Sequence, residues 1–97
     1  MSFEVRTTAA FDRWFEDLRD LQAQARILTR IRMVERGGFG DVKPVGEGVS
    51  ELRIAYEPGY RRYFRQRGQT VMVLLCGGDK KTQRADIARA RVLAKEV

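Results

Sequence analysis

The chain has 97 residues, of which 43% are hydrophobic and 33% are charged, and its formal net charge is +6. This length and composition predict one globular domain spanning residues 1–97 and exclude a disordered segment. The chain contains no histidine, which excludes imidazole acid–base catalysis, Ser-His-Asp and Cys-His nucleophile systems and nearly all transition-metal sites. We therefore expect neither a metal ion nor another cofactor.

The single cysteine, Cys76, lies in an apolar run over residues 71–76 and is interpreted as a small core residue. One thiol cannot form an internal disulfide, which agrees with a reducing compartment. The first six residues contain no apolar signal core, and no segment approaches the roughly eighteen apolar residues of a membrane helix. These features predict a cytoplasmic protein that does not contact a membrane.

Positive charge is distributed unevenly along the chain. Residues 1–50 contain eight basic and eight acidic side chains, whereas residues 51–97 contain eleven basic and five acidic ones. Fifteen of the nineteen basic residues are arginines, whose planar guanidinium binds phosphate through two parallel hydrogen bonds. We therefore expect the second half of the chain to contact an anionic partner.

The first elements predicted in chain order are a strand and two helices. Residues 3–7 alternate between apolar and polar side chains, as a short strand does. Thr7 and Thr8 then offer a hydroxyl N-cap for a helix whose apolar stripe is formed by Phe11, Trp14, Phe15 and Leu18. A second helix runs from about residue 21 to Gly37-Gly38, and its predicted core face consists of Leu21, Ala25, Leu28 and Ile31, with Val34 near its end.

Glycine-rich and β-type segments follow. Residues 37–48 contain five of the nine glycines and predict a long loop. Three strands are predicted over residues 51–56, 60–66 and 71–76, and Gly77-Gly78 is expected to end the last of them. Thr82 is expected to cap a final helix from Gln83 to about Lys95. Because short turns join the three strands into an antiparallel meander, we predict an α+β two-layer sandwich with the N-terminal helical pair on one face of the sheet and a C-terminal helix.

The predicted strand at residues 60–66 carries arginine on both faces. Arg61 shares one face with Tyr63 and Arg65, and Arg62 shares the other with Tyr60 and Phe64. Four arginines and no acidic residue lie between Pro58 and Gly78, interleaved with aromatic rings that could stack on unpaired RNA bases. The pattern suits RNA binding, but a solvated basic sheet without a ligand would show it as well, and both interpretations stay open at this point.

Several short motifs also recur in a known group of proteins. Gly-Gly-Asp-Lys-x-Thr-Gln occurs at residues 77–83, Leu-Arg-Ile at 52–54 and Gly-Tyr-Arg at 59–61. Further matching segments are residues 11–14, 39–45, 49–54, 74–83 and 86–90, so that nearly the whole chain is covered. In these segments the chain resembles the RelE/ParE superfamily of type II toxin–antitoxin toxins, and most closely its HigB-like addiction-module killer branch, to which the Gly-Gly-Asp-Lys motif is rather specific.

The resemblance implies a RelE/ParE-like fold and a toxin that cleaves mRNA on the ribosome without a metal ion, using the RNA's own 2′-OH as the nucleophile. It implies catalytic roles for Arg61 at the scissile phosphate, for Arg53 on the preceding strand, and for Lys80 and Lys81 after the last strand. Predicted RNA-binding residues are Lys43, Tyr63, Arg65 and Arg67. Some family members use a histidine or a C-terminal tyrosine near the site; this chain has neither, and Tyr63 is the predicted substitute. The implied partners are a cognate antitoxin protein and ribosome-bound mRNA.

Two other functions are compatible with the same resemblance. One is inhibition of DNA gyrase, as in the ParE toxins, which would block supercoiling while leaving mRNA intact. The other is a non-catalytic module that binds RNA or a protein partner, which would show salt-dependent RNA affinity without cleavage. The sequence leaves both of these alternatives open.

Overall fold

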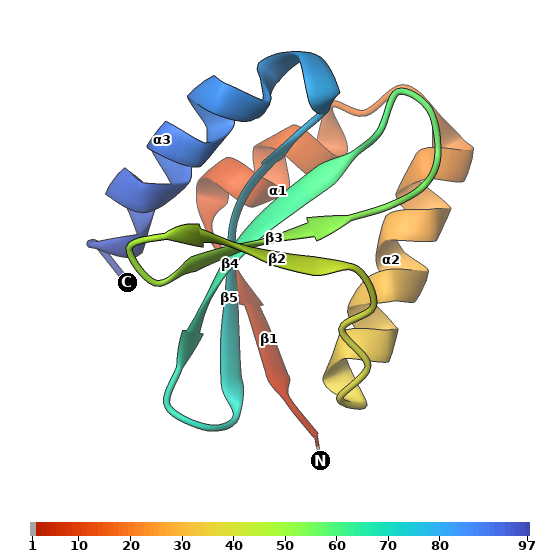
Figure 1. Cartoon of the computed structure of the whole chain (residues 1–97). Coiled ribbons are helices and arrows are strands. Elements are labelled where there is room, and N and C mark those ends of the chain that lie inside the picture. The colour runs from red at the N-terminus through yellow and green to blue at the C-terminus, as the bar shows by residue number, and fades with distance from the viewer. Residues whose placement is uncertain (1) are drawn as a thin grey trace.

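The computed structural model describes residues 2–97, and its centre is a five-stranded sheet with the strand order β1-β5-β4-β3-β2 (Figure 1). Met1, part of the N-terminal stretch in which no signal core was found, lies outside the described residues. The strands are β1 (Glu4–Thr7), β2 (Val42–Gly46), β3 (Val49–Arg53), β4 (Arg61–Arg67) and β5 (Val71–Gly78). The helices are α1 (Ala9–Glu16), α2 (Leu21–Glu35) and α3 (Gln83–Ala94), with the short 3-10 turn η1 (Lys80–Thr82) before α3.

Strands β2 to β5 form an antiparallel meander, and β1 pairs in parallel with β5 at the edge of the sheet. The meander predicted from the short turns is therefore confirmed, but the prediction of one long loop over residues 37–48 is wrong. Val42–Gly46 forms a strand because Glu47 and Gly48 turn the chain tightly back into β3. Both have positive φ, 54° and 78°, the sign that a type I′ hairpin requires at its two central residues.

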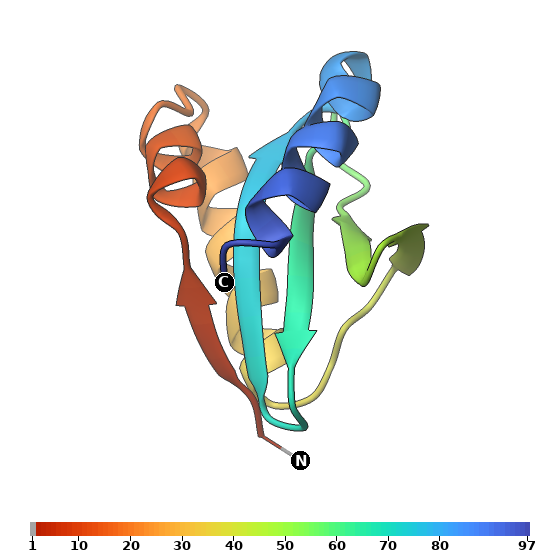
Figure 2. The ribbon, with the colours of Figure 1, turned by 90° about the vertical axis from the view of Figure 1, so that its left-hand side faces the viewer.

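The helical pair covers one face of the sheet and α3 covers the other (Figure 2). The predicted α+β fold with the pair on one face is confirmed. The core on the side of the pair contains Phe11, Ile27, Val34, Leu52, Ile54, Phe64, Met72 and Leu74. The core beneath α3 contains Val49, Tyr63, Val73, Leu75, Cys76, Ala90 and Ala94. Among the helices of residues 2–97, none has the length and apolar character needed to cross a membrane.

Helix α1 begins as the sequence predicts, because the Thr8 hydroxyl accepts a hydrogen bond from the Phe11 amide at 3.1 Å. Helix α2, however, is rotated relative to the prediction. Its buried residues are Ala23, Ile27 and Val34, whereas Leu21 and Leu28 are 77% and 43% exposed. Of the predicted core face, Ile31 and Val34 pack against the core. The side-chain amide of Gln24 donates to the carbonyl oxygens of Phe15 at 2.9 Å and Leu18 at 3.2 Å, which ties α2 to the end of α1.

The segment from β5 to α3 differs from the prediction in two details. Strand β5 continues through Gly77 and Gly78, which were expected to end it. Thr82 does not cap α3 with its side chain; its hydroxyl instead contacts the Asp86 carboxylate. The capping residue is Asp79, which accepts hydrogen bonds from the amides of Lys81 at 2.8 Å and Thr82 at 3.2 Å and so begins the turn η1.

The arginines of β4 lie on separate faces because side chains alternate along the strand, and the pairing of β4 with β5 contains a β-bulge. Tyr63 pairs with Cys76, whereas Phe64 pairs with Leu74, so that Leu75 is the additional residue on β5. The bulge leaves the alternation along β4 unchanged, so that Arg61 and Tyr63 face α3, and Arg62 and Phe64 face the helical pair. The structure thereby decides which arginine is inward: Arg62 is only 1% exposed.

Candidate functional site

The candidate site lies at the end of the sheet where β3, β4 and β5 come together beside η1. Arg53 pairs in register with Arg61, and Arg61 pairs with Gly78 on β5. Residues directly opposite each other in antiparallel strands project to the same face, so the two arginine side chains lie next to each other. They line a cleft of about 250 Å³ together with Asp41, Ile54, Ala55, Gly59 and Tyr60.

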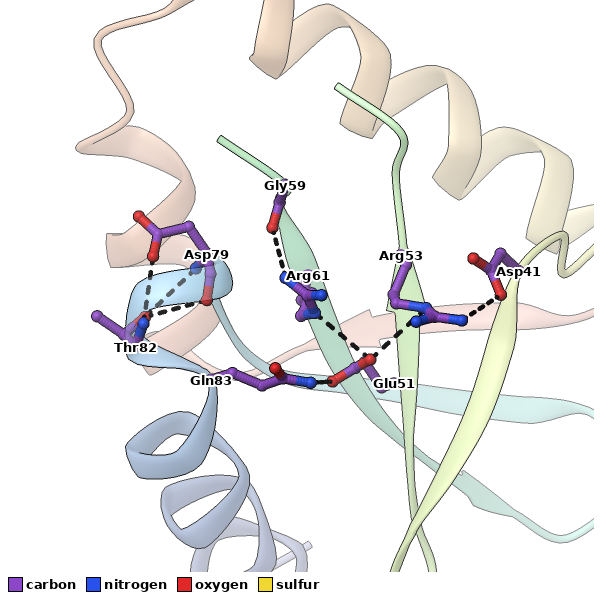
Figure 3. Close-up of polar contacts among 8 residues, drawn as sticks. All are labelled: Asp41, Glu51, Arg53, Gly59, Arg61, Asp79, Thr82 and Gln83. Carbon is purple, nitrogen blue, oxygen red and sulfur yellow. Dashed lines mark hydrogen bonds and ion pairs between the residues drawn. The ribbon is translucent and has the colours of Figure 1, made fainter. Parts of the chain in front are cut away.

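A buried carboxylate lies between the two arginines (Figure 3). Glu51 is 0% exposed, and its Oε1 lies 3.5 Å from Nε of Arg61 and 3.8 Å from Nε of Arg53. Its other oxygen, Oε2, accepts a hydrogen bond of 2.8 Å from the side-chain amide of Gln83, the first residue of α3. The site therefore joins β3, β4 and α3 through one carboxylate.

Each arginine has a second contact on its outer side. Nη2 of Arg53 lies 3.1 Å from Oδ1 of Asp41, an exposed pair, and Nη1 of Arg61 donates to the carbonyl oxygen of Gly59 at 3.0 Å. The Arg61 side chain is 12% exposed and that of Arg53 is 40% exposed. A guanidinium has five N–H donors, so donors of both arginines remain available to an anion in the cleft.

Lys80 comes close to this cleft from the other side. A methyl group built on Gly59 would lie 3.5 Å from Nη1 of Arg61 and 3.6 Å from Cβ of Lys80. Lys80 and Lys81 are both exposed on η1, which Asp79 fixes directly after β5. The structure thus brings together three of the four residues predicted as catalytic, Arg53, Arg61 and Lys80, and places Lys81 one residue further along the same turn.

The residues predicted to bind RNA are dispersed. Lys43 on β2 is exposed and pairs in register with Glu51, which places it on the same face as the two site arginines. Arg67 is exposed at the far end of β4, six residues from Arg61, a separation of about 20 Å along a strand. Lys43 therefore shares a face with the site arginines without lining the cleft, and Arg67 lies far from the cleft.

Two of the predicted RNA-binding residues are structural instead. Tyr63 is 0% exposed because it packs beneath α3, so it does not offer its ring to RNA or its hydroxyl to the cleft. Burial raises the pKa of the Tyr63 phenol, and the neighbouring Glu51 carboxylate also raises it, so the phenol stays protonated at neutral pH and cannot accept a proton. Arg65 donates from Nη1 to the carbonyl oxygens of Ala94 at 2.8 Å and Val97 at 2.6 Å, and so fixes the end of α3.

Sequence reasoning did not include Glu51, Gln83 or Tyr60 in the site. The alternation of side chains along β3 could have placed Glu51 on the face of Arg53, but no local signal shows that α3 begins beside it. Tyr60 lines the cleft, and its burial, together with the charges of Asp20 and Asp79, raises the pKa of its phenol. Within residues 2–97, no three His, Cys, Asp or Glu side chains gather in a metal-ligating cluster.

Comparisons with known proteins agree on the fold and its family. Residues 13–95 match the family described as Phage derived protein Gp49-like (DUF891). An uncharacterized protein of Haemophilus influenzae is 44% identical over 97 residues, which cover all of this chain and 98% of that protein.

Two solved structures share the architecture. A chain of the toxin–antitoxin complex RelBE2 from Mycobacterium tuberculosis superposes with a TM-score of 0.69 at 20% identity, over 82% of this chain and 100% of that one. The free E. coli toxin RelE, as a double arginine-to-alanine mutant, superposes with a TM-score of 0.75 at 12% identity, over 95% and 96% of the two chains. The predicted RelE/ParE-like fold is thereby confirmed.

Proposed function

The chain belongs to the Gp49-like family of phage-derived proteins, and from this membership, its RelE fold and its arginine-lined cleft we propose that it is the toxin of a type II toxin–antitoxin system. In this proposal it acts in the cytoplasm as a HigB-like, metal-independent endoribonuclease. It cleaves mRNA on the ribosome and so inhibits translation. The observation that carries the proposal is the pair Arg53 and Arg61 at one cleft, with Lys80 beside it.

The chemistry of RNA self-cleavage suits such a cleft. The 2′-oxygen forms a bond to phosphorus as the bond from phosphorus to the 5′-oxygen breaks, which leaves a 2′,3′-cyclic phosphate and a free 5′-hydroxyl. The 2′-OH gives up its proton and the departing 5′-oxygen gains one. Negative charge grows on the non-bridging oxygens in the transition state, where fixed guanidinium donors are most effective.

In our proposal the residues divide this work. Arg61 and Arg53 bind the non-bridging oxygens, and Lys80 and Lys81 supply the ammonium groups beside them. Lys43 binds a neighbouring phosphate from β2. Since Tyr63 is buried, proton transfer falls to a lysine of η1, or to water and the RNA itself.

The deciding experiment is primer extension on cellular mRNA after expression of the chain alone. Cuts within translated codons, together with arrest of growth, are the expected result. Arg61→Ala should lower the cleavage rate about a hundredfold or more, the usual cost of removing one donor to a developing oxyanion. Arg32→Ala, which removes an exposed arginine of α2 on the other side of the fold, is the matched control and should cut at the wild-type rate.

Growth arrest with intact mRNA would contradict the endoribonuclease. If purified gyrase then also lost its supercoiling activity in the presence of the chain, the ParE-like alternative would replace it. Binding of RNA without cleavage of mRNA or growth arrest would instead favour the non-catalytic binding module.

The proposal also includes a partner antitoxin, because one of the structural neighbours is a toxin–antitoxin complex. The +6 charge of the chain favours an acidic partner segment. Co-expression of the adjacent reading frame should restore growth and co-purify with the chain. Growth arrest that persists when each adjacent reading frame is co-expressed would contradict the proposal of a partner antitoxin.

A further inference from the structure

Glu51 is a fully buried carboxylate that lies between two arginines of the candidate site. Transferring a carboxylate from water to a protein interior costs several kcal/mol unless opposite charges and hydrogen bonds compensate it. A hydrophobic residue would fill the same volume without that cost. The position of this charge is therefore better explained by what it does to its neighbours than by stability.

The geometry shows which part of each arginine the carboxylate contacts. Oε1 faces the Nε edge of both Arg61 and Arg53, at 3.5 and 3.8 Å (Figure 3). The guanidinium is a rigid planar fork, so a contact at Nε directs part of its terminal amino groups away from the carboxylate. Glu51 thus holds both arginines from behind and leaves terminal N–H donors for the cleft.

The carboxylate is itself held in place from the other side of the site. Oε2 accepts the 2.8 Å hydrogen bond from Gln83, which is positioned by the start of α3. Arg61 is further restrained by the Gly59 carbonyl oxygen, and Arg53 by Asp41. Each arginine therefore has one partner of its own, and Glu51 is the partner that they share.

We propose that Glu51 is a positioning residue that sets the spacing and direction of Arg61 and Arg53 for one phosphodiester, and that Gln83 fixes the carboxylate. The inference rests on the proposed function, since it assigns a role within RNA cleavage. Displacing a catalytic group by about 1 Å can cost a hundredfold in rate. Loss of Glu51 should therefore lower the turnover of bound RNA more than it weakens RNA binding.

The first test is a double-mutant cycle on cleavage of ribosome-bound mRNA. Glu51→Gln keeps the size of the side chain and an oxygen that can accept from Gln83, but removes the charge. We expect kcat to fall at least tenfold with KM changed less than threefold. The loss caused by Glu51→Gln should be clearly smaller in the Arg61→Ala background, because Arg53 is then the one arginine that Glu51 still positions. A wild-type kcat, or a full tenfold loss retained in the Arg61→Ala background, would overturn the proposal.

The second test does not require activity. The Nε–H signal of Arg61 in ¹H–¹⁵N spectra should shift and exchange faster with water in Glu51→Gln, while that of Arg32 on α2 stays unchanged. An Arg61 signal that is unaffected by Glu51→Gln would refute the positioning role. If the wild type cleaves no mRNA although this signal responds, the proposed function fails and the positioning of the arginine stands.

A third variant keeps the proposal testable if Glu51→Gln does not fold. Gln83→Ala leaves the charge of Glu51 but removes the hydrogen bond to Oε2. It should reproduce the kcat loss in part, about threefold to tenfold, with the same change in the Arg61 Nε–H signal. A Gln83→Ala protein with wild-type kcat and an unchanged Arg61 Nε–H signal would contradict the proposal that Gln83 fixes the carboxylate of Glu51.

Discussion

The indole ring of Trp14 on α1 lies directly against the backbone of Gly77 at the end of β5, where a Cβ on residue 77 would overlap the ring. On the opposite face of the strand, a Cβ on Gly78 would overlap the carboxylate of Asp86 on α3. The two glycines therefore allow helices on both faces of the sheet to approach the strand end that carries η1. Their role is to leave room for these side chains and not to turn the chain.

Gly77→Ala should lower the free energy of unfolding by about 1–3 kcal/mol, because the added methyl group forces Trp14 or the strand to move. Urea denaturation measures the change. In a Trp14→Ala background the same substitution should cost much less, since the overlapping ring is gone. Gly38→Ala is the control: a Cβ there makes only ordinary contacts, the nearest to the Met33 carbonyl oxygen at 3.4 Å. Equal costs with and without Trp14 would refute the explanation.

Arg62→Met should stabilise the protein by about 1–3 kcal/mol, because replacing a buried charge by a hydrophobic residue of similar volume is often favourable. Arg62 is 1% exposed, and within residues 2–97 its Nε and Nη1 have no hydrogen-bond partner. Burial, together with the nearby charge of Arg30, lowers the pKa of Arg62 to about 10. Arg32→Met on the exposed face of α2 should stay within about 0.5 kcal/mol of the wild type. A destabilised Arg62→Met protein would show that the charge is compensated.

Cys76 should react with thiol reagents only after unfolding. It is 0% exposed, and burial, together with the charge of Asp86, raises its pKa from 9.0 to about 11. Because the folded thiol keeps its proton to a higher pH than the unfolded thiol, its contribution to stability is present below pH 9 and is lost as pH rises toward 11. Alkylation at pH 8 with and without urea checks whether Cys76 reacts only after unfolding. Comparing the pH dependence of unfolding with that of Cys76→Ala checks the contribution to stability, and rapid alkylation of the native protein would contradict both.

Arg65→Ala should lower the free energy of unfolding by about 1–3 kcal/mol, because it removes two charged hydrogen bonds to the carbonyl oxygens of Ala94 and Val97. The matched control is Arg67→Ala on the same strand, an exposed side chain that should change stability by less than about 0.5 kcal/mol. Thermal unfolding of the two variants decides the comparison. Equal stability losses would show that the contact to α3 contributes nothing.

The elements that depend on local signals could be predicted from the sequence. The Thr8 cap and the stripe beginning at Phe11 placed α1, and the short turns placed the meander. The orientation of α2 could not be predicted, because Leu21 and Leu28 would suit a core but are exposed, whereas Ala23 and Ile27 on another face are buried. The choice between these faces depends on tertiary packing and not on the local pattern. Strand β2 was missed because its glycines were counted as loop residues although they form the hairpin turn.

The sequence predicted the cationic residues of the candidate site but not the contacts that hold them in place. The motif segments placed Arg53, Arg61 and Lys80 in one region, and the structure brings them together at one end of the sheet. The burial of Tyr63 and Glu51 depends on the packing of α3 beside them, which is a contact between distant parts of the chain that local alternation does not predict. The bulge at Leu75 changes the faces only on β5, where Leu75 and Cys76 both lie beneath α3. A one-residue bulge reassigns faces that simple alternation treats as fixed.

The parallel pairing of β1 with β5 has a consequence for the order in which the protein can form during its synthesis. The Thr8 hydroxyl binds the Leu75 carbonyl oxygen across 67 residues, so the N-terminal edge of the sheet must wait until the C-terminal strands have left the ribosome. Such long-range pairing slows folding, because the entropy cost of closing a large loop comes before the stabilising contacts form. A nascent chain that stops before β5 lacks the strand that joins β1 to β4, and with it the neighbour of Arg61 on β5. The newly made protein therefore acquires its charged cleft only in the last stage of folding, after a period in which chaperones, proteases or a partner can reach it first.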